Sequence, residues 1–259
     1  MFSIWWIAFF AMLILFHLVA AVAVLLKRND LADVAWGPGF PLIAGAAAML
    51  NLVEWDSRKI LVFSMVSLWA LRLFLHIGVR TLRHEHEDAR YAKMREGWGE
   101  KWVSRSYLKV FMLQGFLLYL FSFSLLAILG GESQPLGIYA WLGLALWSLG
   151  FFFEAVGDEQ LRRFKANPMN KGKLMTGGLW GWTRHPNYFG EIALWWGIWL
   201  MAVEVPGAQW TIIAPLALTF VIIKISGVSM LEAMMKSRPG YNEYAAAVPA
   251  FFPKPPRKR

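Results

Sequence analysis

The sequence predicts an all-α integral membrane protein, a bundle of seven transmembrane helices with the N-terminus outside and the C-terminus in the cytoplasm. First, 58% of the 259 residues are hydrophobic, including 15 Trp and 19 Phe, which exceeds the apolar share of a typical soluble domain. Second, apolar stretches recur that are long enough to cross a hydrocarbon layer of about 30 Å as helices. Third, basic residues concentrate in alternate connections between these stretches.

The seven spans follow from the apolar stretches, taken in order along the chain. They are expected at about 4–26, 34–52, 60–79, 108–130, 137–156, 187–204 and 209–228. The second span contains the sequence GPGFP at residues 37–41. This sequence indicates either a helix broken at membrane depth, which would form the wall of a pocket, or a plain proline kink.

The orientation follows from the connections. Those after the first, third, fifth and seventh spans are basic, whereas 131–136 and 205–208 contain no Lys or Arg, and 53–59 balances two basic residues with two acids. Cytoplasmic loops are the basic ones, so the C-terminus is expected inside. The net charge of +9 therefore suits lipid headgroups and a phosphate-bearing cofactor, and no nucleic-acid partner is predicted. The chain has no Cys, which excludes disulfides and thiolate metal sites.

Charged residues inside predicted spans indicate a polar interior. Asp33 and Trp36 lie at the start of the second span, and Arg72 lies deep in the third, one turn before His76 and two before Arg80. A charge within the bilayer usually faces the bundle interior or a cavity. Arg80 can extend to the interface, whereas Arg72 is expected to face a polar cavity.

The segment RHEHEDARY at 83–91 raises the question of a metal site. His84 and His86 are two residues apart, so they point to different sides of a helix and suit one metal ion badly. We predict no metal here and interpret the segment as a solvated cytoplasmic face with Arg90 and Tyr91 available to a cofactor.

The connection between the fifth and sixth spans carries polar residues at helical spacing. Glu154, Asp158 and Arg162 follow one another at four-residue steps, which is either a simple charge ladder or one face of a binding site. Lys165 and Lys173 precede a pair of glycines, and basic side chains beside such a turn suit phosphate. No glycine-rich nucleotide fingerprint of the Rossmann or Walker type occurs.

Further along the chain, Lys224 and Glu232 are eight residues apart. They share one face if the helix continues regularly. The alternative for Lys224 is a side chain that simply extends to the lipid headgroups.

The stretch LMTGGLWGWTRHPNYFGEI (174–192) resembles the signature shared by the steroid 5α-reductases and the sterol C14/C24 reductases. In those proteins a Gly-Trp-rich element precedes Arg-His-x-Asn-Tyr, then Gly and an acid. Residues from about 150 to 250 resemble the cofactor half of that family. Asp158 and the basic residues after it match its cofactor helix, and Asn187 and Glu191 match its Asn and Glu.

The resemblance implies a bacterial inner-membrane enzyme that binds NADPH from the cytoplasmic side. It implies reduction of the C4–C5 double bond of a 3-oxo-4-ene steroid or similar lipophilic enone, with an acid that polarises the carbonyl. We treat 1–259 as a single domain, in which about 1–150 is the substrate-side half. The family's early Gln-Glu pair is absent, so Asp33 becomes the expected acid, and Trp69 stands where a later Tyr would be.

The expected catalytic residues are Asp33, Trp36, Trp69 and Arg72. The expected cofactor-binding residues are Arg80, Arg90, Tyr91, Asp158, Arg162, Lys165, Lys173, Arg184, His185, Asn187, Tyr188, Glu191, Lys224 and Glu232. Arg184 at the mouth of the sixth span is expected to bind a phosphate, unless the cluster around it only pins the loop to the bundle. Lipid and the substrate are the expected partners, without an obligate protein partner.

A methyltransferase is the alternative function. Isoprenylcysteine and phospholipid methyltransferases also carry an RHPxY element followed by a Glu and a Tyr-x-x-Tyr, and this chain has Glu232, Tyr241 and Tyr244. The numerous cytoplasmic basic residues favour NADPH over S-adenosylmethionine, which has no phosphate. A non-enzymatic lipid-binding or scaffold protein would not need Asp33 and Arg72 inside the bundle.

Overall fold

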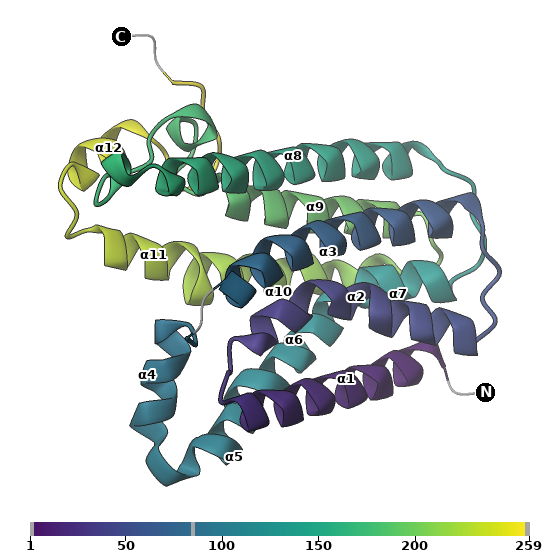
Figure 1. The fold of residues 1–259 in the computed structure, drawn as a ribbon. Coiled ribbons are helices and arrows are strands. Elements are labelled where there is room, and N and C mark those ends of the chain that lie inside the picture. The colour runs from purple at the N-terminus through teal and green to yellow at the C-terminus, as the bar shows by residue number, and fades with distance from the viewer. Residues whose placement is uncertain (1–2, 84–85, 257–259) are drawn as a thin grey trace. The chain divides into compact units, whose positions relative to one another are not determined.

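The computed structural model describes residues 3–83 and 86–256, and within these ranges all regular structure is helical (Figure 1). The chain forms two compact units. Unit 1 comprises Met1–Leu136 and Val205–Ala208, and unit 2 comprises Gly137–Glu204 and Gln209–Arg259. The main boundary between the two units therefore lies between residues 136 and 137. The single domain with halves that meet near residue 150 stays a prediction.

Unit 1 is built around three long helices, with α2 in contact with both α1 and α3. Its helices are α1 (Ile4–Leu26), α2 (Leu31–Leu50), α3 (Ser57–Arg83), α4 (Ala89–Trp98), η1 (Gly99–Lys101), α5 (Trp102–Ser106), the π-helix η2 (Tyr107–Met112), α6 (Leu113–Phe121) and α7 (Phe123–Gly130). The last two are bent by 48° at Ser122. The Ser122 hydroxyl donates to the Leu118 carbonyl at 2.8 Å, a bond within the preceding turn that is common where helices bend.

The α2 helix runs without a break through Pro38 and Pro41, so the broken helix considered for this segment is wrong. The neighbouring glycines instead allow close packing. A Cβ atom on Gly37 would lie 2.9 Å from the Ala70 carbonyl oxygen of α3, and one on Gly39 would collide with the Leu118 side chain of α6. The GPGFP sequence therefore brings neighbouring helices against the α2 backbone.

Unit 2 is dominated by the pair α8 and α9, which lie side by side along most of their length (Figure 1). Its helices are α8 (Ile138–Ala166), η3 (Pro168–Asn170), η4 (Gly178–Gly181), α9 (Pro186–Ala202), η5 (Gln209–Ile212), α10 (Ile213–Phe220), the π-helix η6 (Val221–Ser226), α11 (Val228–Met235) and α12 (Tyr241–Ala247).

Glycines spaced seven residues apart explain the close contact of α8 with α9. Seven residues are about two helical turns, so such glycines share one face. A Cβ on Gly143 would lie 2.5 Å from the Gly197 carbonyl oxygen, and one on Gly150 would lie 2.5 Å from the Gly190 carbonyl oxygen. The two backbones are therefore in direct contact, and any larger residue must separate them.

We expect Gly190→Ala to destabilise unit 2, because the added methyl would lie 2.5 Å from the Glu154 backbone nitrogen. Overpacking of this kind costs about 1–3 kcal/mol. Thermal unfolding of the purified protein in detergent should show a lower midpoint for this variant. Gly177→Ala is the matched control, since a Cβ there meets nothing within 4 Å. Equal midpoints for the two variants would contradict the packing argument.

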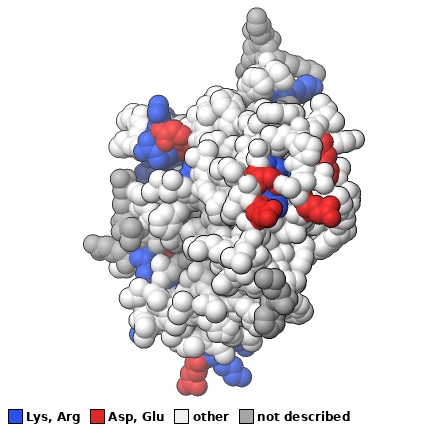
Figure 2. All heavy atoms as spheres, turned by 90° about the vertical axis from the view of Figure 1, so that its right-hand side faces the viewer, with Lys and Arg blue, Asp and Glu red and all other residues white. Residues whose placement is uncertain are grey.

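Within the described residues, four helices are long and apolar enough to cross a membrane. These are Ile4–Leu26, Ser57–Thr81, Ile138–Ala166 and Gln209–Met235, and the bent pair Ala89–Phe121 with Phe123–Gly130 makes a fifth if it is one span. Large apolar side chains such as Leu25 and Phe152 are exposed on these helices, as expected for a lipid-facing surface. Figure 2 shows one face of the molecule, on which charged side chains form only a few small groups.

Candidate functional site

The RHPNYFGE motif lies where the long connection after α8 ends and α9 begins. His185 has a non-helical backbone (φ −137°, ψ 64°), and Pro186 occupies the first helical position. Proline suits this position because its missing N–H would have no partner inside the helix. Arg184 and His185 therefore precede the first turn of α9, and Asn187, Tyr188 and Glu191 lie within its first two turns.

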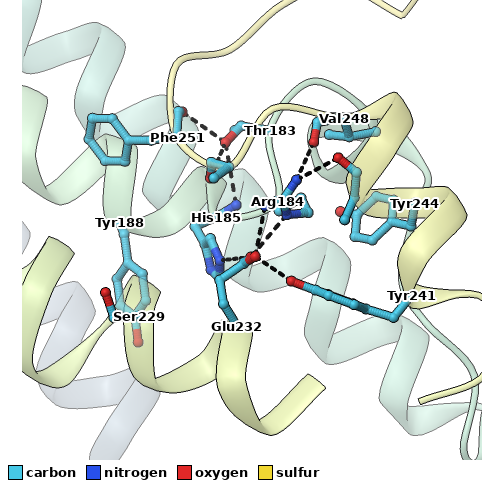
Figure 3. A network of polar contacts seen from close by, with 12 residues as sticks. Thr183, Arg184, His185, Tyr188, Ser229, Glu232, Tyr241, Tyr244, Val248 and Phe251 are labelled. Atoms are coloured by element: carbon cyan, nitrogen blue, oxygen red, sulfur yellow. Dashed lines mark hydrogen bonds and ion pairs between the residues drawn. The ribbon is translucent and has the colours of Figure 1, made fainter. Parts of the chain in front are cut away.

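Arg184 is held by a carboxylate and by backbone carbonyls (Figure 3). Its Nε and Nη2 donate to the two oxygens of Glu232 at 2.9 and 2.7 Å, and its Nη1 donates to the carbonyls of Ala245 and Val248 at 3.0 and 2.6 Å. The hydrogen bond to Glu232 raises the pKa of Arg184. Most of the donors that were expected to bind a phosphate are therefore engaged within the protein.

Glu232 on α11 is the centre of this network. Besides Arg184 it is bonded to the Nε2 atom of His185 at 2.8 Å and accepts from the Tyr241 hydroxyl. Burial lowers the pKa of His185, so the ring is neutral at pH 7 and its Nε2–H donates to the carboxylate. Burial also raises the pKa of Tyr241 to about 12, which keeps the phenol protonated as a donor. We call Arg184, His185, Glu232 and Tyr241 the Glu232 cluster.

The C-terminal segment, residues 241–254, is bonded to the loop that carries the motif. The backbone of Arg184 donates to Pro249 at 3.0 Å, and Lys254 donates back to Trp182 at 2.9 Å. The Thr183 hydroxyl lies 2.8 Å from the Phe251 carbonyl, and the Tyr244 hydroxyl donates to the Trp180 carbonyl at 2.6 Å. These bonds fix the loop in front of α9 although the two parts are more than 60 residues apart.

Asp158 and Asn187, which both match the reductase signature, are in contact. The Asn187 side-chain amide donates to the Asp158 carboxylate at 3.1 Å, across 29 residues of sequence. The approach is possible because a Cβ on Gly157 would already lie 3.1 Å from Pro186. The Trp180 indole N–H also donates to the Gly157 carbonyl at 2.9 Å, which anchors the loop to α8.

The remaining motif residues lie next to these two groups. The rings of His185 and Tyr188 stack with centroids 5.7 Å apart, and both side chains are drawn in Figure 3. The Nδ1 atom of His185 is buried and has no hydrogen-bond partner among the described residues. In the neutral ring, whose proton is on Nε2, this atom is an unsatisfied acceptor. Glu191 is partly buried in the second turn of α9.

The predicted basic cofactor residues of unit 2 are mostly on the surface. Lys165, Lys173 and Lys224 are exposed, and Arg162 forms an exposed pair with Glu159 at 2.6 Å. The regular helix that a shared face of Lys224 and Glu232 would require is not present between the two residues. Lys224 belongs to the π-helix η6, and Gly227 (φ −112°, ψ −103°) separates η6 from α11.

Unit 1 contains a second polar group, centred on Asp33 at the start of α2. Its carboxylate accepts from the Tyr91 hydroxyl at 2.7 Å and lies 3.6 Å from Nη2 of Arg90. The Gln114 amide donates to the Tyr91 oxygen at 3.0 Å and lies 3.5 Å from the Asp33 carboxylate. We call Asp33, Tyr91 and Gln114 the Asp33 cluster. It borders a cavity of about 350 Å³ that Arg80 and Asp88 also line.

The structure groups the predicted unit 1 residues differently from the sequence analysis. Asp33, expected with the substrate, lies with Arg90 and Tyr91, expected with the cofactor. Trp36 and Trp69 both pack against Phe40, with ring centroids 5.7 and 5.4 Å away, and Trp69 is completely buried. Arg72 is partly buried on α3.

The sequence analysis missed Gln114. The signal was present, since Gln114 is an uncharged polar residue within the apolar stretch 108–130. Of the segment expected to form a cytoplasmic face, His84 and Glu85 lie outside the described residues. No group of three or more potential metal ligands occurs within the described part of the chain.

Comparisons with known proteins show the family of the chain. An uncharacterized protein of Schizosaccharomyces pombe, C594.04c, is 27% identical over 225 residues, which cover 76% of this chain and 64% of that protein. The probable O-methyltransferase ustE of Ustilaginoidea virens is 46% identical over 59 residues, covering 23% of this chain and 20% of that protein. The chain thus matches less than two thirds of the length of either relative. No solved structure matches it. The family model described as protein of unknown function (DUF1295) matches residues 19–248, and the chain belongs to this family.

Proposed function

We propose that the protein is a membrane-bound NADPH-dependent reductase that reduces the C4–C5 double bond of a 3-oxo-4-ene steroid or similar lipophilic enone. The contact between Asp158 and Asn187 is the observation that carries this proposal. The resemblance to steroid 5α-reductases assigns both residues to the cofactor, and Asp158 on α8 contacts Asn187 in the first turn of α9. This supports a binding site in unit 2 that is built from two helices.

The start of α9 suits a polar, anionic cofactor. The first backbone N–H groups of a helix have no partner within it, and the helix dipole favours negative charge there. The Asn187 amide can both donate and accept, as a nicotinamide carboxamide or a ribose requires. Because Arg184 is engaged with Glu232, we assign it to holding the loop and leave the phosphates to exposed residues such as Lys165 and Lys173.

The Asp33 cluster of unit 1 supplies the chemistry needed at a carbonyl. In enone reduction a hydride adds to the β-carbon, C5, and negative charge develops on the carbonyl oxygen. A hydrogen-bond donor at that oxygen stabilises the transition state, and a proton then adds at C4. Protonated Asp33 is the proposed donor, and Tyr91 and Gln114 hold its carboxyl group in place.

Equilibrium titration of the purified protein with NADPH and with S-adenosylmethionine tests the proposal. NADPH is expected to bind, and Asn187→Ala should weaken its binding by about 1.5–3 kcal/mol, the contribution of a hydrogen bond to a charged group. Asn242→Ala, an exposed position on α12, is the matched control and should bind like the parent. Binding of S-adenosylmethionine without NADPH would overturn the proposal.

The second candidate function is a membrane S-adenosylmethionine-dependent methyltransferase. It is supported by the Glu232 cluster, in which the Glu and the first Tyr of the Tyr-x-x-Tyr sequence meet the Arg-His pair. The sequences of isoprenylcysteine and phospholipid methyltransferases carry the same four residue types. The same titration decides between the two functions.

The proposed topology has seven spans, with α2 and α9 added to the candidate spans, in the inner membrane of a bacterium. The N-terminus lies outside, and the C-terminus and cofactor site face the cytoplasm, as the basic connections indicate. Alkaline phosphatase, which is active only outside the cytoplasm, should be inactive when fused at the C-terminus and active when inserted at 131–136. The opposite pattern of activities would contradict this topology.

A further inference from the structure

Unit 1 contains a second cavity, of about 440 Å³, at the other ends of its long helices. It lies where α1 begins, α2 ends, α3 begins and α7 ends, the ends drawn on the right in Figure 1. Both α1 and α3 are long enough to cross a membrane. The Asp33 cavity, which Thr81 lines, is at the far end of α3. The two cavities therefore lie near opposite boundaries of the membrane.

A buried ammonium group lines this second cavity. Lys59 is 5% exposed, and its Nζ donates to the Glu54 carbonyl at 3.2 Å and lies 3.7 Å from the Asp56 carboxylate. Charged groups are rarely buried without several partners. An ammonium has three donors, so Lys59 retains the capacity to bind an oxygen atom of a ligand in the cavity.

The cavity also carries a negative group. Glu54 lines it and is exposed. The loop 53–59 as a whole balances two basic residues with two acids. A simple anion would be attracted by Lys59 and repelled by Glu54. A simple cation would be attracted by Glu54 and repelled by Lys59. A ligand with one charge of each sign matches both residues.

The remaining lining is mixed: Ser3 and Asn51 are polar, and several other side chains are apolar. Ile4, Trp5 and Leu129 line the cavity, and Leu52 and Trp55 beside it are 79% and 44% exposed. Tryptophan is typical of the boundary between headgroups and acyl chains. The ligand should therefore have a zwitterionic head and an apolar body.

We propose that this cavity binds the headgroup of a phospholipid that carries a phosphate diester and a primary ammonium. Lys59 binds a phosphate oxygen, and the Glu54 carboxylate accepts from the ammonium. The acyl chains run along the apolar surface near Trp5 and Leu129. This site is separate from the proposed cofactor and substrate groups and does not depend on the proposed function.

Native mass spectrometry of the full chain tests the proposal, with three phospholipids that share the same acyl chains. Phosphatidylethanolamine has both charges, phosphatidylglycerol lacks the ammonium, and phosphatidylcholine has a quaternary nitrogen without an N–H donor. The parent should retain phosphatidylethanolamine about tenfold more strongly than the other two, the effect of one charge-assisted hydrogen bond.

Two variants assign the contacts. Glu54→Gln should reduce the preference for phosphatidylethanolamine over phosphatidylglycerol to within about twofold, since it removes one charge-assisted contact. Lys59→Met should weaken retention of all three lipids. Glu100→Gln, an exposed acid on η1, should leave the preference unchanged. The proposal is overturned if the parent retains the three lipids equally, or if Glu54→Gln keeps the preference of the parent. Both outcomes can be measured even if Lys59→Met does not fold, because Glu54 is exposed.

Discussion

Asp33→Asn is expected to lower the turnover of the enone by about 100-fold or more, the scale of general acid catalysis, while NADPH binding stays close to that of the parent. The amide keeps the shape of the carboxyl group and its contacts with Tyr91 and Gln114, but it cannot deliver an acidic proton to the carbonyl oxygen. Single-turnover measurements of NADPH oxidation with the substrate present give the rate of the chemical step.

Two further variants make this test specific. Tyr91→Phe removes one hydrogen bond to Asp33 and leaves the carboxyl group, so a smaller loss of rate is expected. Glu96→Gln, an exposed acid on α4, should turn over like the parent. Full activity of Asp33→Asn would remove Asp33 from the mechanism.

Glu232→Ala is expected to destabilise the protein by about 3 kcal/mol, the lower end of the cost of removing one partner from a buried ion pair, because this pair is partly buried. Arg184 and Glu232 have side chains that are only 12% and 18% exposed. Without Glu232, the Arg184 guanidinium and the His185 ring would both lose a partner. Thermal unfolding in detergent, followed by near-ultraviolet circular dichroism, should show a much lower midpoint.

The double variant Arg184→Met, Glu232→Leu removes the ion pair without leaving an unpaired charge. It therefore separates the free energy of the pair from the cost of burying an unpaired guanidinium. Replacing both partners with apolar residues is often close to neutral, so this variant should be more stable than Glu232→Ala. Glu243→Gln, an exposed acid on α12, should unfold like the parent. If Glu232→Ala melts at the parent temperature, the pair does not hold the loop in place.

The apolar stretches located the helices well, because a helix that crosses a membrane is apolar over most of its length. The first expected span, 4–26, coincides with Ile4–Leu26. The fifth was expected at 137–156, but α8 continues to Ala166. Hydropathy detects only the apolar part of a helix, and the polar turns after Glu154 continue the same helix beyond it.

Partners that are distant in sequence could not be predicted in the same way. In the sequence, Arg184 directly precedes a helix and was therefore expected to bind a phosphate. Its carboxylate partner, Glu232, lies 48 residues later in the chain. Neither periodicity nor charge pattern shows which acid a basic residue will meet. The resemblance assigned Asp158 and Asn187 to a cofactor but did not predict that they contact each other. The Asp33–Gln114 contact joins two residues that are 81 positions apart in the sequence.

The bonds between the C-terminal segment and the motif loop set an order of events during synthesis. Translation delivers the loop well before residues 245–254, which supply its carbonyl and N–H partners. When α9 has just emerged from the ribosome, Thr183 and Arg184 therefore lack those partners. The loop can reach its final form only after residues 245–254 have emerged. Assembly of this end of unit 2 is thus a late step that follows insertion of the helices.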